Sequence, residues 1–347
     1  MKTKMRVMTE KPLNAETPVE FLKSWITPNT VFFDRNQGAL PLRRISLRRW
    51  RLVVEGDVET PITLTFDQIR RMPKAIAADT LECSGNGRSL LLEKTPGNPW
   101  TIGGVGNAVW GGVRLRDVLQ MAGPKSMARH VSFEGFDTPL GSSGIKFIRS
   151  IPLEKALSST LLACEMNGEA LPLKHGYPLR ALALGWTGAN CVKWLSHIVV
   201  MDRPYEGFFM DNVYRVFQKG RDSKTGEVIK GIKLKSIITQ PQPGEILAGG
   251  TIVILGAAYA GEADVERVEV STDGGAIWRP AEFIGPHEPY AWRQWQWVWE
   301  AGDPGTYTLM ARAVDDTGRP QPMQAEWNVL GYGNNGAREH AVTVTIT

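Results

Sequence analysis

One cysteine of the sequence lies where a reactive thiol would be expected. Cys83 follows an alternating segment at residues 76–81, is followed by turn-forming residues, and has Arg88 five positions further on. A thiolate that binds a metal or attacks a substrate needs access and nearby positive charge, which favours its ionisation. The glycine-containing turn allows a tight bend. A buried structural cysteine before a surface turn fits the same residues, because free cysteine is among the most buried residue types.

Cationic side chains occur in or beside loops that follow apolar segments elsewhere in the chain. Loops at strand ends are where a rigid scaffold displays its binding groups, and arginine's planar fork of donors suits oxyanions. One thiol together with several cations indicates an anionic cofactor, an anionic substrate, or both. Each could instead be an ordinary surface charge or, for the histidine, a structural hydrogen-bonding group. The residues are Arg35, Arg88, His175, Arg180 and Lys193.

Composition and charge exclude several classes of protein. The chain has 347 residues, 42% of them hydrophobic and 22% charged, which is typical of about two globular domains. A net charge of +4 without a long Lys/Arg run does not indicate a nucleic-acid partner. No run of eighteen apolar residues and no signal-peptide pattern occurs, so we expect no membrane span and a cytoplasmic location. A periplasmic location is expected only if a leader was removed.

The cysteine count argues against other cofactors and folds. The three cysteines, Cys83, Cys164 and Cys191, form no CxxC pair and no CxxCH motif. Zinc-ribbon, thioredoxin-type and haem-attachment interpretations therefore fail.

The first part of the chain is predicted to be mixed α+β. Residues 1–30 are expected to form an extended arm, and residues 96–112 a glycine-rich ordered loop with Trp100. Without regular βαβ alternation or a GxGxxG motif, a Rossmann domain is not expected. Residues 31–38 are expected to form a short apolar strand running into a polar turn, and residues 64–72 are expected to end with a helical turn. Predicted strands cover 50–56, 76–81, 130–136, 161–166, 181–184 and 196–201; helical segments cover 113–122 and 153–159, and a loop covers 137–144.

The pattern changes at about residue 233. Short strands at 252–258, 265–271, 292–299, 306–315 and 341–346 are separated by Gly/Asp turns, which is typical of an antiparallel β-sandwich. Three tryptophans at strand spacing, Trp295, Trp297 and Trp299, are expected in its core or at an interface. We therefore predict two domains, residues 1–232 and 233–347.

Five segments in order along the chain carry a family resemblance. They are residues 81–88, 110–119, 175–180, 188–195, and the pairs Trp327-Asn328 and Gly331-Tyr332. Together they resemble the sulfite oxidase family of molybdopterin enzymes, over nearly the whole chain from about residue 28. The resemblance implies a molybdopterin-binding α+β domain followed by an immunoglobulin-like antiparallel β-sandwich that mediates homodimer formation.

The resemblance also implies a cofactor and roles for particular residues. It implies a mononuclear molybdenum centre on one pyranopterin, without haem, with Cys83 as the protein thiolate on the metal. By the same resemblance the cofactor would be held by Phe33, Asp34, Arg35, Asn36, Gln37, Cys83, Asp137, His175, Arg180, Cys191, Val192 and Lys193. Arg35, Arg88, Trp100 and Tyr214 would line the pocket of a small anionic substrate, and Cys83, Tyr214, Arg35 and Arg88 would be catalytic.

The implied reaction oxidises sulfite to sulfate by oxygen-atom transfer. The two electrons would leave one at a time to a separate acceptor, a cytochrome or oxygen. The cofactor would carry the difficult chemistry, while the protein supplies orientation and electrostatics.

The chain departs from animal and plant sulfite oxidases at four positions. Gly87 and Leu330 stand where those proteins have arginine, Gln37 where they usually have histidine, and Val213 where they have aspartate. The pocket therefore has fewer cations than theirs. Two alternatives follow: the same cofactor acting on another sulfur or N/S-oxide compound, in the manner of a sulfane dehydrogenase, or a non-enzymatic anion-binding adhesion protein in which Cys83 is dispensable.

Overall fold

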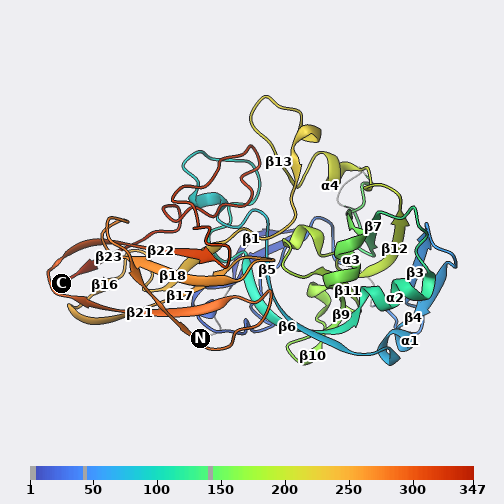
Figure 1. The fold of residues 1–347 in the computed structure, drawn as a ribbon, viewed down its shortest axis with the longest axis horizontal. Helices are drawn as coiled ribbons and strands as arrows, with labels where there is room; N and C mark the ends of the chain where they lie inside the picture. The colour runs from blue at the N-terminus through green and yellow to red at the C-terminus, as the bar shows by residue number, and fades with distance from the viewer. Residues whose placement is uncertain (1–4, 42–44, 140–143) are drawn as a thin grey trace.

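The structure is a computed structural model that describes residues 5–41, 45–139 and 144–347. Figure 1 shows a mixed α+β region beside a β-sandwich, with the C-terminus at the far end of the sandwich. Strands dominate both parts. The expected α+β region followed by an antiparallel sandwich is confirmed, whereas the division at residue 232 stays a prediction.

Two five-stranded sheets form the frame of the α+β region. One has the order β10-β9-β6-β5, with β11 also paired to β9, and the other has the order β4-β3-β12-β7-β8. The pairing of β12 with β3 is parallel. The strands are β3 (Arg51–Gly56), β4 (Ile62–Thr65), β5 (Ala75–Glu82), β6 (Val105–Arg114), β7 (His130–Gly135), β8 (Ile148–Pro152), β9 (Thr160–Met166), β10 (Glu169–Ala170), β11 (Arg180–Ala183) and β12 (Leu195–Met201).

Short helices and two small hairpins complete this region. The α-helices are α1 (Phe66–Arg71), α2 (Leu115–Ala122), α3 (Leu153–Ser159) and α4 (Phe208–Asp211). Single 3₁₀ turns are η1 (Val19–Phe21), η2 (Arg88–Leu90), η4 (Leu173–His175), η5 (Gly188–Asn190) and η6 (Ser223–Thr225). The hairpins are β1 (Arg6–Glu10) with β2 (Leu13–Glu16), and β13 (Arg215–Val216) with β14 (Glu227–Val228).

The sandwich consists of a four-stranded and a five-stranded sheet. Their orders are β15-β17-β21-β20 and β16-β23-β22-β18-β19. Trp295 and Trp299 are buried between them, and Trp297 packs half-buried against the same core, as the strand spacing predicts. The strands are β15 (Lys235–Gln240), β16 (Ile246–Leu247), β17 (Gly250–Tyr259), β18 (Val265–Ser271), β19 (Arg279–Pro280), β20 (Glu282–Ile284), β21 (Arg293–Ala301), β22 (Gly305–Asp315) and β23 (Val342–Ile346).

Two expectations for the first hundred residues are wrong. The presumed arm contains the β1–β2 hairpin, and residues 31–38 form no strand; Asp34 only makes an isolated bridge with Ala15. This stretch is held instead by burial, since Phe32 and Phe33 stack with their ring centroids 5.3 Å apart.

The glycine-rich stretch at 96–112 is also misassigned in part, because its second half forms β6. Two glycines of this strand are required by close neighbours. A Cβ at Gly106 would lie 2.7 Å from the Phe32 ring, and one at Gly112 would lie 2.0 Å from the Leu162 carbonyl oxygen. Glycine therefore marks close packing here and not a loop. Of the loop expected at 137–144, residues 140–143 lie outside the described residues.

Candidate active site

Two adjoining hollows meet at Cys83. The first, called the His175 pocket, is lined by Phe32, Phe33, Arg35, Asn36, Gln37, Leu81, Cys83, Ser84, Asp137, Phe147, His175, Arg180, Gly188, Ala189, Cys191, Lys193, Trp194 and Tyr214. The second, called the Arg88 pocket, is lined by Thr9, Pro12, Asn14, Arg35, Asn36, Gln37, Cys83, Arg88, Pro96, Gly97, Asn98, Trp100, Val213, Tyr214, Leu330 and Tyr332. Five residues belong to both: Arg35, Asn36, Gln37, Cys83 and Tyr214.

Cys83 is the first residue after β5 and its backbone is fixed on both sides. Its N–H donates to the carbonyl oxygen of Gly104 at 2.8 Å, and its carbonyl oxygen accepts from the Asn86 N–H at 2.8 Å. The thiol is free and 6% exposed. Burial raises the pKa of Cys83, although the positive charges of Arg35 and Arg88 pull it down. A bound metal cation would displace the thiol proton outright.

Arg88 is held at the edge of its pocket by backbone carbonyls. Its Nε donates to Leu330 at 3.0 Å and its Nη1 to Asn98 at 2.8 Å. A Cβ at Gly85 would lie 2.5 Å from Nη2, so glycine there gives the guanidinium its space. Nη2 takes part in neither bond and can donate to an anion, and a hydrogen bond from a charged donor is stronger than one between neutral groups.

Tyr214 lies between the two pockets in a strained backbone conformation with φ of 58°. Its hydroxyl accepts a hydrogen bond of 2.5 Å from Gln37 Nε2, and its ring stacks on Tyr332 with centroids 5.6 Å apart. A non-glycine residue in the left-handed region persists only where its surroundings hold it. Gln37 and Tyr332 therefore orient the hydroxyl here, beside the half-buried Val213.

Cations converge on the His175 pocket. Arg180 donates from Nη1 to the carbonyl oxygen of His175 at 2.9 Å, and Lys193 donates to the carbonyl oxygen of Lys174 at 3.1 Å. Burial lowers the pKa of Arg180 to about 10. Burial and the charge of Arg180 lower the pKa of Lys193 to about 7. Burial and the neighbouring cations lower the pKa of His175 well below its ordinary value, so its ring is neutral at pH 7.

The polar atoms of this pocket fit a large anionic ligand. Within the described part of the chain, the buried Arg180 Nε has no hydrogen-bond partner. Buried polar groups are normally satisfied, so an unpaired donor beside a cationic cavity indicates a group that a ligand completes. Lys193 also contacts Asn36 Oδ1. The donor set suits a phosphate-bearing cofactor.

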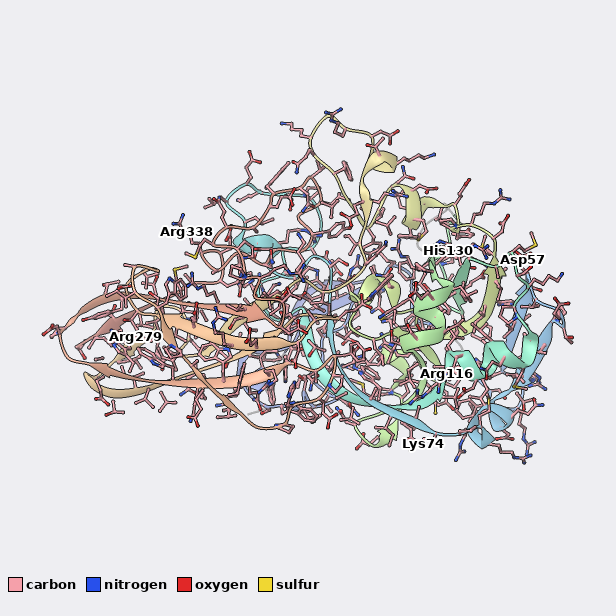
Figure 2. The ribbon with its side chains drawn as sticks, in the orientation of Figure 1. Asp57, Lys74, Arg116, His130, Arg279 and Arg338 are labelled. Atoms are coloured by element: carbon pink, nitrogen blue, oxygen red, sulfur yellow. The ribbon has the colours of Figure 1, made fainter. Side chains whose placement is uncertain are left out.

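These groups differ from the ordinary surface charges. Of the side chains that Figure 2 labels, Lys74 lies at the outer edge of the molecule, and Lys74, Arg116 and Arg279 are all exposed. Arg180 is only 3% exposed and His175 only 2%. Burying such groups without a ligand is unfavourable, which supports a binding role for them.

Most of the expected site residues come together. Two of them do not line either pocket: Val192 belongs to the hydrophobic core, and the Asp34 carboxylate accepts from Lys174 Nζ at 3.0 Å behind His175. Only backbone groups of Val192 remain for a ligand, and its carbonyl oxygen already accepts from the Ala181 N–H at 2.9 Å. Trp100 is fully buried and lies edge-on to Phe33, at the Arg88 pocket.

Two residues that the sequence reasoning did not single out support the site. Asn14, on β2, accepts from Arg35 Nη1 at 3.2 Å and from the Asn36 N–H at 2.9 Å. Arg149, on β8 and fully buried, has its guanidinium carbon 5.3 Å from the centre of the Tyr214 ring. A charged residue inside an apolar strand was the available signal for Arg149. For Asn14 only the paired segments on either side of Pro12 could have indicated a hairpin.

Comparisons with known proteins identify the family of the chain. Residues 37–209 match the family described as "Oxidoreductase molybdopterin binding domain", and residues 226–345 match the "Mo-co oxidoreductase dimerisation domain". The chain is 37% identical to sulfite oxidase from Gallus gallus, covering 94% of this chain and 75% of that protein. It is 35% identical to the mitochondrial sulfite oxidase of Mus musculus, covering 95% of this chain but 64% of that protein. The chain belongs to the sulfite oxidase family of molybdopterin-binding oxidoreductases.

A solved structure gives the same architecture. The sulfane dehydrogenase SoxCD from Paracoccus pantotrophus superposes with a TM-score of 0.83 at 30% identity, covering all of this chain and 89% of that one. The protein is thus a molybdoenzyme of this fold. The family, the fold class and the enzyme class predicted from the sequence are confirmed. No helix in the described ranges is long and apolar enough to cross a membrane.

Proposed function

We propose that this protein oxidises sulfite to sulfate, with a molybdenum cofactor in the His175 pocket and the substrate in the Arg88 pocket. The balanced reaction takes sulfite and water to sulfate, two protons and two electrons, and the electrons pass to a separate cytochrome or to oxygen. When bound, the cofactor supplies the oxygen-atom transfer to sulfur and accepts the electron pair. The meeting of both pockets at Cys83 is the observation that supports this assignment.

The chain's own residues have distinct tasks in this proposal. Cys83 would bind the metal through its thiolate, and Arg180, Lys193 and His175 would hold the cofactor by charge and hydrogen bonds. Arg35 and Arg88 would attract the substrate anion and stabilise charge that builds on its oxygen atoms. The Tyr214 hydroxyl, fixed by Gln37, would donate a hydrogen bond to the same oxygens.

A second substrate class, a protein-bound sulfane sulfur, is favoured by one observation. Among the described residues that line the Arg88 pocket, positive charge comes from Arg35 and Arg88, while Leu330 and Gln37 are neutral. A pocket with two cations suits a less highly charged sulfur compound than the sulfite dianion. The whole-length likeness to a sulfane dehydrogenase is in line with this alternative.

Metal content and substrate preference test the proposal together. Wild type from a host that makes the cofactor should contain about one molybdenum per chain and reduce ferricyanide when sulfite is added. Cys83→Ser should lose both properties. Metal-free wild type would overturn the proposal, and turnover of a cysteine-persulfide peptide without turnover of sulfite would select the second substrate class.

The assembly and the compartment are further parts of the proposal. The dimerisation-domain match at residues 226–345 supports a homodimer, which sedimentation velocity would detect. A cytoplasmic location stays a prediction, to be tested by cell fractionation.

A further inference from the structure

A buried carboxylate from the residue before Cys83 is bound by the sandwich. Glu82, only 4% exposed, accepts from Lys235 Nζ at 2.7 Å and from the Tyr259 hydroxyl at 2.9 Å. Lys235 begins β15 and Tyr259 ends β17, and both are 1% exposed. The second half of the chain therefore reaches the residue adjacent to the candidate metal ligand.

The same carboxylate oxygen also fixes the turn that follows Cys83. Asn86 Nδ2 donates to Glu82 Oε1 at 2.9 Å, and Asn86 Oδ1 accepts from the Gly104 N–H at 2.9 Å. The Gly104 carbonyl oxygen in turn accepts from the Cys83 N–H at 2.8 Å. These bonds form a closed network around the Cys83 backbone, and Lys235 and Tyr259 are its contributions from the sandwich.

A buried network of this kind is sensitive to the loss of one member. Removing the Lys235 ammonium would leave the Glu82 carboxylate buried without its counter-charge, and an unpaired buried charge is strongly unfavourable. Movement toward water, or new hydrogen bonds from other donors, would lower the free energy of the unpaired carboxylate. Either change would move Asn86 and hence the turn that carries Cys83.

We propose that Lys235 and Tyr259 are positioning residues that hold the Cys83 turn in the geometry needed for metal binding. The sandwich would thus help to build the active site, a role separate from the pairing of two subunits. The inference rests on the proposed role of Cys83 as the metal ligand.

The chain offers a matched control. Lys155, on α3, pairs with Glu262 of the sandwich at 2.7 Å and also donates to the Leu184 carbonyl oxygen at 2.6 Å. This contact joins the same two parts of the chain but includes no member of the Cys83 network. Glu262→Gln removes its charge with little change in shape.

Two measurements test the proposal: amide hydrogen exchange and metal content. Both are made on the full-length protein from a host that makes the cofactor. In Lys235→Met we expect the amides of residues 83–90 to exchange at least about tenfold faster and molybdenum per chain to fall at least about threefold. We expect Glu262→Gln to leave both at the wild-type level. Unchanged exchange and metal content in Lys235→Met, or equal changes in both variants, would overturn the proposal.

A milder variant decides the question if Lys235→Met does not fold. Tyr259→Phe keeps the ring and removes only the hydroxyl donor, so we expect a smaller change of exchange and metal content in the same direction. Exchange at the wild-type rate in Tyr259→Phe would then count against the proposal. If wild type itself carries no molybdenum, the proposed function fails, while the exchange comparison still decides the positioning role.

Discussion

The two pockets that meet at Cys83 differ in how their charges are arranged. In the His175 pocket, Arg180 and Lys193 are enclosed by protein and their pKa values are lowered by burial. In the Arg88 pocket, the walls are mostly amide, aromatic and aliphatic groups, and Arg88 has used two of its nitrogens on backbone carbonyls.

This difference in charge arrangement implies different ligand selectivity for the two pockets. A cavity with enclosed cations and an unpaired buried donor fits one large ligand and few others, because each buried group needs its partner. A pocket with two arginines and neutral neighbours attracts anions in general and can be retuned by single substitutions. Under the proposed function, the whole cavity would select the cofactor, and a few side chains would select the substrate.

The largest effect is expected from the His175 pocket. Arg180→Met removes a buried cation, and truncating one partner of a buried charged contact costs about 2–5 kcal/mol, or about 30- to 5000-fold in affinity for the cofactor. We expect most molybdenum and pterin to be absent, as measured by metal analysis and pterin fluorescence. The exposed Arg116→Met is the control. A fully loaded Arg180→Met protein would show that the enclosed cations do not hold the cofactor.

A smaller effect is expected from Arg88→Met. Hydrogen bonds to charged groups contribute about 1.5–3 kcal/mol, so kcat/KM for sulfite should fall by about 10- to 150-fold. Molybdenum content should stay at the wild-type level because the residue lines only the other pocket. Steady-state kinetics with metal analysis checks both, and loss of metal would erase the distinction between the pockets.

Adding a cation should sharpen the comparison. In Leu330→Arg the backbone carbonyl that accepts from Arg88 is retained, and the new guanidinium would raise the positive charge of the Arg88 pocket. We expect the KM for sulfite to fall by about 3- to 30-fold, equal to about 0.7–2 kcal/mol, while any turnover of a persulfide peptide declines. An unchanged ratio of the two activities would show that charge does not select the substrate.

The smallest effect concerns pH. Lys193 has its pKa lowered to about 7 in the folded chain, against 10.5 as the ordinary value, chiefly by burial and by Arg180. Between these values the unfolded chain holds the extra proton, so the free energy of unfolding rises with pH across this window. For cofactor-free protein we expect Tm to rise by about 2–4 °C from pH 7 to pH 9. Thermal melts should show a flatter profile for Lys193→Met, and an identical slope would contradict the assignment.

Local pattern was sufficient for much of the fold. Alternation predicted β5 up to Cys83, helical spacing with Gly123 predicted α2, and evenly spaced turns predicted the sandwich strands. Each of these depends on residues close in sequence. Residue propensity failed to predict β6. Gly106 and Gly112 are required by close contact with Phe32 and Leu162, which lie far away in the sequence.

The site residues also fall into two groups, those that local sequence identifies and those that depend on distant contacts. Cys83, His175 and Lys193 stand in short distinctive segments, so the family resemblance identified them. The roles of Asn14 and Lys235 depend on contacts between distant segments, and no local pattern distinguishes them from surface polar residues. A single sequence does not show which distant residue a side chain contacts, and that contact gives these side chains their role in positioning the site.

The β1–β2 hairpin has a practical consequence for handling the protein. Through Pro12 and Asn14 it forms part of the wall of the Arg88 pocket, and β1 begins at Arg6. A purification tag fused before β1 would be attached to the same hairpin that contains Asn14, which orients Arg35. A tag placed behind β23 lies at the far end of the sandwich (Figure 1) and leaves that wall undisturbed.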